Sequence, residues 1–158
     1  MANTQSMCTS FMGELLTATH NFGTAPIRAA TTADTFKAAL YLASATINAA
    51  TTAYSSTGEV TGTNYTAGGV TVTNATAPTA TNSSSTAGVA YWTPSASFVY
   101  TTVTLTTAFD SVLVYNSTQS NKAVSVHTFG SQTITAGTFT LTMPSNTTTT
   151  ALLRLSTT

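Results

Sequence analysis

The sequence has very few charged residues. Only 5% of its 158 residues are charged, with four basic and four acidic side chains and a formal net charge of zero, whereas soluble domains average about 25%. Nucleic-acid binding takes much of its affinity from Lys and Arg that neutralise phosphates, and Arg28, Lys37, Lys122 and Arg154 are scattered singly along the chain. We therefore expect no nucleic-acid partner. The lack of a basic cluster argues equally against binding to a membrane surface.

Long hydrophobic runs and paired cysteines are also missing. No stretch of the sequence approaches the roughly 20 apolar residues that span a bilayer. The start of the sequence carries neither a positive charge nor the apolar stretch of a signal peptide. Cys8 is the only cysteine, so no disulfide forms within the chain. These absences predict synthesis in a reducing cytoplasm.

Hydroxyl side chains take the place of the missing charges. The chain has 40 Thr and 17 Ser, and 42% of its residues are hydrophobic. Disorder usually combines low hydrophobicity with high net charge, and this sequence has neither. It therefore predicts one folded domain whose surface is rich in hydroxyl groups.

The N-terminal segment has a helical hydrophobic pattern. Between Ser6 and His20 the apolar residues recur at spacings of three, four and one, which places them on one side of a short helix. These residues are Met7, Phe11, Met12, Leu15 and Leu16. Because such a stripe must be buried somewhere, we interpret residues 1–30 as a helical assembly segment and these five side chains as candidate assembly contacts.

From residue 35 onward the hydrophobic period is two, which is typical of β-strands. The stretch from Asn74 to Gly88 is of low complexity and predicts an exposed loop. Several short strands separated by turn formers predict an all-β domain over residues 31–158, either an antiparallel β-sandwich or a jelly roll. The predicted strands lie at 36–42, 70–73, 97–107, 112–115, 123–129, 132–135, 138–143 and 151–155.

The sequence offers few groups for catalysis or metal binding. They are Cys8, His20 and His127 and the carboxylates Glu14, Asp34, Glu59 and Asp110. A Cys8/His20/Asp34 arrangement would supply a nucleophile, a base and an orienting carboxylate, but the local signatures of cysteine enzymes are absent. The carboxylates are far apart in sequence, and no CxxC, HExxH or EF-hand loop is present. We therefore expect no enzyme activity, no cofactor and no metal, with calcium at Asp34 or Asp110 as an open alternative.

The densest aromatic cluster consists of Tyr91, Trp92, Phe98 and Tyr100. Exposed rings of this kind stack on sugars, so the cluster raises a carbohydrate-binding module as one alternative function. We favour the interpretation that Trp92 fills the core of a sandwich. His127 lies in an alternating strand and is interpreted as a solvated or interface histidine, whereas Asp110 is expected to make a turn hydrogen bond.

Six segments stand out together: 1–16, 34–41, 52–59, 65–69, 115–124 and 127–130. They resemble segments of small virion proteins of tailed bacteriophages, and the likeness runs over most of the chain. The resemblance implies a structural component of the virion, made in the bacterial host cytoplasm, which forms a homo-oligomer and binds the major capsid protein or other virion proteins. Among such roles we rank a capsid cement or decoration protein that bridges capsomers first. A tail, adaptor or fibre-base component comes second.

Deletion of residues 1–20 tests the predicted assembly segment. If the apolar stripe serves assembly, the shortened chain remains a folded β domain by circular dichroism but no longer joins particles or oligomers in sedimentation. Complete unfolding of the shortened chain would instead place the stripe in the domain's own core.

Overall fold

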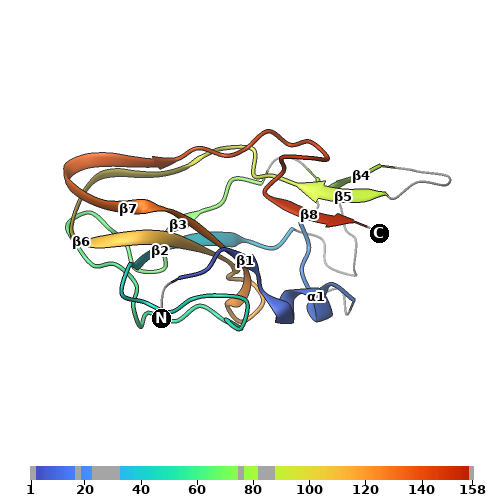
Figure 1. Cartoon of the computed structure of the whole chain (residues 1–158), viewed down its shortest axis with the longest axis horizontal. Coiled ribbons are helices and arrows are strands. Elements are labelled where there is room, and N and C mark those ends of the chain that lie inside the picture. The colour runs from blue at the N-terminus through green and yellow to red at the C-terminus, as the bar shows by residue number, and fades with distance from the viewer. Residues whose placement is uncertain (1–2, 17–18, 23–32, 75–76, 82–87, 157–158) are drawn as a thin grey trace.

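The computed structural model describes residues 3–16, 19–22, 33–74, 77–81 and 88–156. Its elements are β1 (Ser6–Met7), α1 (Thr9–Leu16), β2 (Phe36–Leu42), β3 (Val70–Thr71), β4 (Thr79–Ala80), β5 (Val89–Trp92), β6 (Phe98–Asn116), β7 (Lys122–Leu141) and β8 (Leu153–Ser156). They form two antiparallel sheets with the strand orders β1-β7-β6-β2-β3 and β4-β5-β8 (Figure 1). The predicted antiparallel all-β class is confirmed. Within the described ranges, no helix is long and apolar enough to cross a membrane.

The long strands β6 and β7 form a bent ribbon. They pair from Phe98 opposite Leu141 to Asn116 opposite Lys122, with repeated register shifts between these ends. Ala136 in β7 has a positive φ of 47°. Irregularities of this kind bend a strand pair, and Figure 1 shows both strands turning back at one end of the domain. Each of the two strands therefore has one segment before the bend and one after it, and the two segments lie one above the other in Figure 1.

The bent ribbon corrects the predicted strand boundaries. We expected β6 to be divided between residues 107 and 112, and β7 to be divided near Gly130 and Gly137, but each is one strand. Asp110 consequently lies within β6 and not in a turn. At the positions where we expected the strands to end, the pairing of β6 with β7 only shifts in register. A β-bulge accommodates extra residues in one strand without ending the hydrogen-bonded pairing.

The predicted loop from Asn74 to Gly88 also needs a correction. Thr79 and Ala80 form β4, which pairs antiparallel with Tyr91 and Ala90 of β5. Residues 75–76 and 82–87 lie outside the described residues. A low-complexity sequence therefore still supplies an edge strand here, because backbone hydrogen bonds do not depend on the side chains.

The core surrounds β2 and the adjoining half of β6. Residues 111–116 of β6 are all buried, and Leu40 of β2 and Leu113 of β6 are fully enclosed. Strands covered on both faces have continuous apolar runs instead of alternating ones. This explains why the sequence around Val112–Tyr115 is apolar without a period of two.

A buried carboxylate fixes the long connection between β2 and β3. Glu59 accepts hydrogen bonds from Tyr54 Oη at 2.6 Å, from Tyr65 Oη at 2.7 Å and from the Gly68 amide at 2.7 Å. A buried charge is tolerated when donors of this kind surround it. Burial, together with the adjacent Glu59, raises the pKa of Tyr65 well above its ordinary value, so the phenol remains a donor. The Leu40 amide of β2 donates to Tyr65 Oη at 3.0 Å, and Tyr115 Oη of β6 donates to the Gly68 carbonyl oxygen at 2.9 Å, so the connection is also held against β2 and β6.

Gly69 is required by its conformation and by a close backbone approach. Its φ is +75°, and an added Cβ would lie 1.8 Å from the Ala38 carbonyl oxygen. We expect Gly69→Ala to lower the free energy of unfolding by about 2 kcal/mol or more, measured by chemical denaturation. Gly130→Ala is the matched control, because the nearest atom to its added Cβ is 4.0 Å away. Equal effects of the two substitutions would contradict this role of Gly69.

Candidate assembly surface

The predicted helical stripe packs against the β domain. Phe11 is 2% exposed, and its ring contacts His20 and Phe22 with centroid separations of 4.8 and 5.9 Å. Met7, which lies in β1, and Leu15 are partly buried against the same core. The side chains of Met12 and Leu16 lie outside the described part of the chain. Phe11 therefore has a role in folding, and the assembly role of the stripe stays a prediction.

A polar network attaches α1 to the start of β7. Glu14 of α1 places Oε2 2.7 Å from His20 Nε2 and Oε1 2.6 Å from Lys122 Nζ. Burial alone would raise the pKa of Glu14, but the hydrogen bonds from Lys122 and His20 outweigh it and lower the pKa. Glu14 is therefore ionised at neutral pH and bridges two elements that are distant in sequence.

The same network continues into the end of β6. Asn116 Nδ2 lies 3.1 Å from His20 Nδ1 and donates to Asp34 Oδ2 at 2.8 Å, and the Asn21 amide donates to the same oxygen at 2.8 Å. An amide nitrogen only donates, so His20 Nδ1 accepts and Nε2 carries the proton that faces Glu14. Burial lowers the pKa of His20, although Glu14 opposes the shift. The histidine is neutral and positions its neighbours.

Cys8, His20 and Asp34 have partners that do not suit nucleophilic catalysis. Cys8 is buried, with Sγ 4.0 Å from the Asn48 carbonyl oxygen. Burial, with a smaller contribution from Glu14, raises the pKa of the thiol to about 11. A cysteine in this state is a thiol at neutral pH and a poor nucleophile. Cys8 is thus a small, fully buried residue that directly precedes α1.

The four carboxylates have separate environments. Glu14 and Asp34 join the network at α1, Glu59 lies among tyrosines, and Asp110 Oδ1 accepts a hydrogen bond from Asn3 Nδ2 at 2.6 Å. Among the described residues, no three His, Cys, Asp or Glu side chains are grouped so that they could hold a metal ion. Donors occupy both Asp34 oxygens, at 2.8 Å from Asn116 and 3.1 Å from Gln119, an environment that favours a structural carboxylate.

His127 forms a hydrogen bond that the sequence analysis missed. Its Nε2 lies 2.8 Å from Ser125 Oγ, and burial lowers the pKa of His127 to about 4. His127 is half-buried, and its role as a solvated or interface histidine stays a prediction. Ser125 is 1% exposed and pairs with Met7 of β1, so a substrate has no access to its hydroxyl. Residues two apart on a strand share a face, and that signal predicts the contact.

The aromatic cluster lies mostly inside the molecule. Trp92, Phe98 and Tyr100 are all buried. The Trp92 ring packs on Phe22 with centroids 4.7 Å apart, and its Nε1 donates to Asn74 Oδ1 at 2.9 Å. The interpretation of Trp92 as a core residue is confirmed. With three of the four rings enclosed, the cluster does not form an exposed platform for a sugar.

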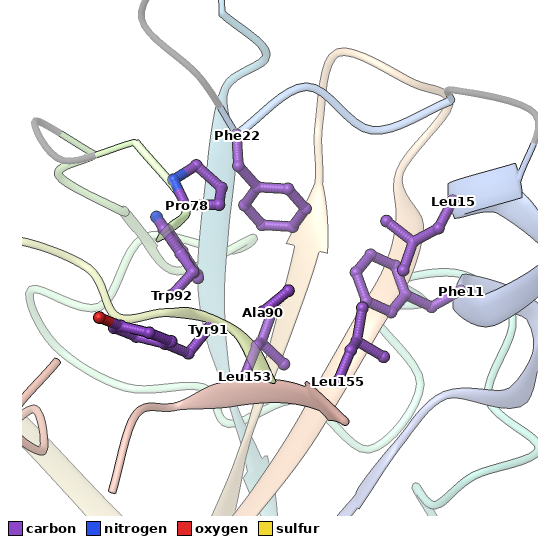
Figure 2. Close-up of a pocket in the computed structure, with 9 residues that line it drawn as sticks. All are labelled: Phe11, Leu15, Phe22, Pro78, Ala90, Tyr91, Trp92, Leu153 and Leu155. Atoms are coloured by element: carbon purple, nitrogen blue, oxygen red, sulfur yellow. The ribbon is translucent and has the colours of Figure 1, made fainter. Parts of the chain in front are cut away.

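An apolar groove opens between α1 and the smaller sheet, with a volume of about 110 Å³. Figure 2 shows Phe11 and Leu15 of α1 on one side, Phe22 and Trp92 on the other, and Leu155 of β8 close to Phe11. Leu155 is 41% exposed. No local sequence pattern indicates this groove, because its walls come from three separate parts of the chain.

The molecular surface carries hardly any charge. Among the charged residues in the described ranges, Arg154 alone is exposed, whereas Asp34 and Glu59 are buried and the others are half-buried. The Arg154 Nε donates to the Thr148 carbonyl oxygen at 2.6 Å. Contacts made by this surface therefore rely on apolar groups, hydroxyl groups and backbone.

Comparison with known proteins brings no relative. No family model matches the sequence, and neither a curated protein nor a solved structure matches the chain. The function is therefore inferred from the residues and their contacts.

Acidification should destabilise the fold through its histidines. The pKa of His127 is lowered from 6.5 to about 4 in the folded state, so the unfolded chain binds more protons than the folded chain between these values. The free energy of unfolding is thus highest above about pH 6.5 and decreases as the pH falls towards 4. We expect His127→Gln to flatten this decrease in urea denaturation measured across the pH series. An unchanged slope would show that His127 does not titrate in this way.

Proposed function

We propose that the chain is a structural protein of a tailed-bacteriophage particle and acts as a capsid cement or decoration protein that bridges capsomers. The observation that carries the proposal is the nearly uncharged surface, on which Arg154 is the one exposed charged residue within the described ranges. A surface of this kind associates through shape, apolar contact and hydrogen bonds. Such contacts are insensitive to ionic strength, which suits a permanent component of a particle.

The apolar groove supplies a contact for the major capsid protein. Leu15, one of the predicted assembly contacts, lines the groove together with the exposed Leu155. Insertion of one large apolar side chain from the capsid protein would contribute about 1.5–3 kcal/mol. Repeated at every site on a particle, a contact of this size holds capsomers together through many weak interactions.

A tail, adaptor or fibre-base component is the second candidate role, and it would use the same chemistry of contact. The two roles differ in the number of copies in a particle. A cement protein covers the head and is present in hundreds of copies, whereas a tail component is present in a few or a few tens. Quantitative mass spectrometry of purified particles therefore separates them.

The proposed binding chemistry predicts retention in salt. Between about 50 mM and 1 M salt the Debye length falls several-fold, so ionic contacts weaken while apolar contacts persist. We expect the amount of this protein that sediments with purified particles to change little over this range. Release in high salt would show that the few charges dominate the interface, and absence of the protein from particles would exclude a virion role.

Two substitutions locate the contact on the surface. Leu155 and Val99 are each 41% exposed, but only Leu155 lines the groove. Leu155→Ser should reduce retention on particles, whereas Val99→Ser serves as the matched control and should leave retention unchanged. Circular dichroism of both variants checks that the domain remains folded. Equal retention of the two variants would remove the groove from the interface.

A further inference from the structure

The outer edge of β7 has no strand partner over much of its length. In the described structure β1 pairs with β7 at Ser125 and Val126, and every other strand pair of β7 is with β6 on its opposite edge. Figure 1 shows the C-terminal part of β7 along the outer margin of the domain. Residues from Thr128 to Leu141 therefore present edge backbone groups, which are a template for pairing with another strand.

Only the last part of this edge lacks all the features that usually prevent pairing. No charged residue and no proline occurs from Ala123 to Met143, whereas natural edge strands are protected by Lys, Pro or bulges. Register shifts interrupt β7 between its pairs at Thr128 and Gln132 and again between Ile134 and Gly137. Beyond these bulges the ladder with β6 is regular through its last three pairs. A further register shift lies between the pairs at Gly137 and Phe139, so the open and regular edge is confined to Phe139–Leu141.

The side chains of this regular edge and of the residues that flank it alternate strictly. Thr138 and Thr140 are exposed, whereas Phe139 and Leu141 are half-buried and pack against the core. Thr142, the next residue, is exposed again. The segment therefore has a threonine face towards solvent and an apolar face towards the core.

We propose that this edge pairs with the same edge of a second copy, antiparallel and with the two-fold axis beside Thr140. This register sets Thr138 opposite Thr142 of the copy and Phe139 opposite Leu141 of the copy. Threonines then meet on the outer face and apolar side chains meet on the inner face, which are both favourable cross-strand pairs. The ribbon continues through the dimer as a four-stranded sheet.

A second copy fits this edge because the segment is complementary to itself. Antiparallel pairing about a two-fold axis uses one patch on both molecules, and the alternation of Thr138–Thr142 is symmetric about Thr140. No like charges face one another in this register, since the segment has no charged residue. The inference is independent of the virion role, because it concerns the isolated chain.

Sedimentation equilibrium of the purified full-length chain tests the dimer. We expect a monomer–dimer equilibrium for the wild type and a dimer weakened about tenfold or more by Thr140→Lys, which places two positive charges next to the axis. Thr71→Lys is the matched control, because Thr71 is exposed on β3 at the opposite edge of the larger sheet. A wild type that stays monomeric at about 100 μM, or equal effects of the two substitutions, would overturn the proposal.

Oxidative cross-linking tests the register. A disulfide requires Cα atoms within about 7 Å, so Thr140→Cys should form a covalent dimer rapidly, whereas Thr71→Cys should not. Cys8 is buried and does not compete. A mixture of Thr140→Lys and Thr140→Glu should recover the association that each variant alone has lost. Equal cross-linking of the two cysteine variants, or no recovery in the mixture, would contradict pairing at Thr140.

Discussion

The pairing of β6 with β7 is the interaction on which the rest of the structure depends. β1 and β2 both add to this ribbon, and β3 adds to β2. The end of β6 and the start of β7 supply Asn116 and Lys122, which hold His20 and Glu14. The bend in the ribbon allows Phe139 near one end of β7 to contact Phe109 in the middle of β6, with centroids 5.2 Å apart. Loss of the bend would therefore open the core as well as change the outline of the domain.

Three of the carboxylates in the described part of the chain stabilise the interior of the protein. Glu59 holds the connection between β2 and β3, and Glu14 and Asp34 hold the N-terminal segment against the ribbon. Each of these carboxylates receives several donors, which compensate for the hydration it loses. With these carboxylates in the interior, the exterior consists mainly of threonine, serine and small apolar side chains. The low charge content is thus linked both to how the chain folds and to how it associates.

The sequence predicted those features that depend on local periodicity. The period of two predicted β2 with its observed bounds of 36–42, but Ala39 and Tyr41 on the other face of the strand are buried as well, which the alternation does not imply. The divisions of β6 and β7 were wrong, since Gly130 and Gly137 have the composition of a turn but lie within a strand. The residues around a glycine do not show whether it lies in a β-bulge or in a turn, because this depends on whether the partner strand continues to pair. The contacts of Glu14 with His20 and of His127 with Ser125 were missed, although their short spacings provide a signal.

The groove could not be found from the sequence, because Phe11 and Leu155 belong to opposite ends of the chain.

The position of the groove also links folding to association. Phe11 packs in the core and lines the groove, and the polar network at Glu14 fixes the same helix. A partner that binds the groove binds only the folded arrangement of α1, so occupancy adds to the stability of that arrangement by mass action. On the proposed function, the N-terminal segment would therefore be held most firmly in the assembled particle. The β7 edge lies on the ribbon and involves none of the groove's residues, so pairing between copies leaves the groove free for its own partner.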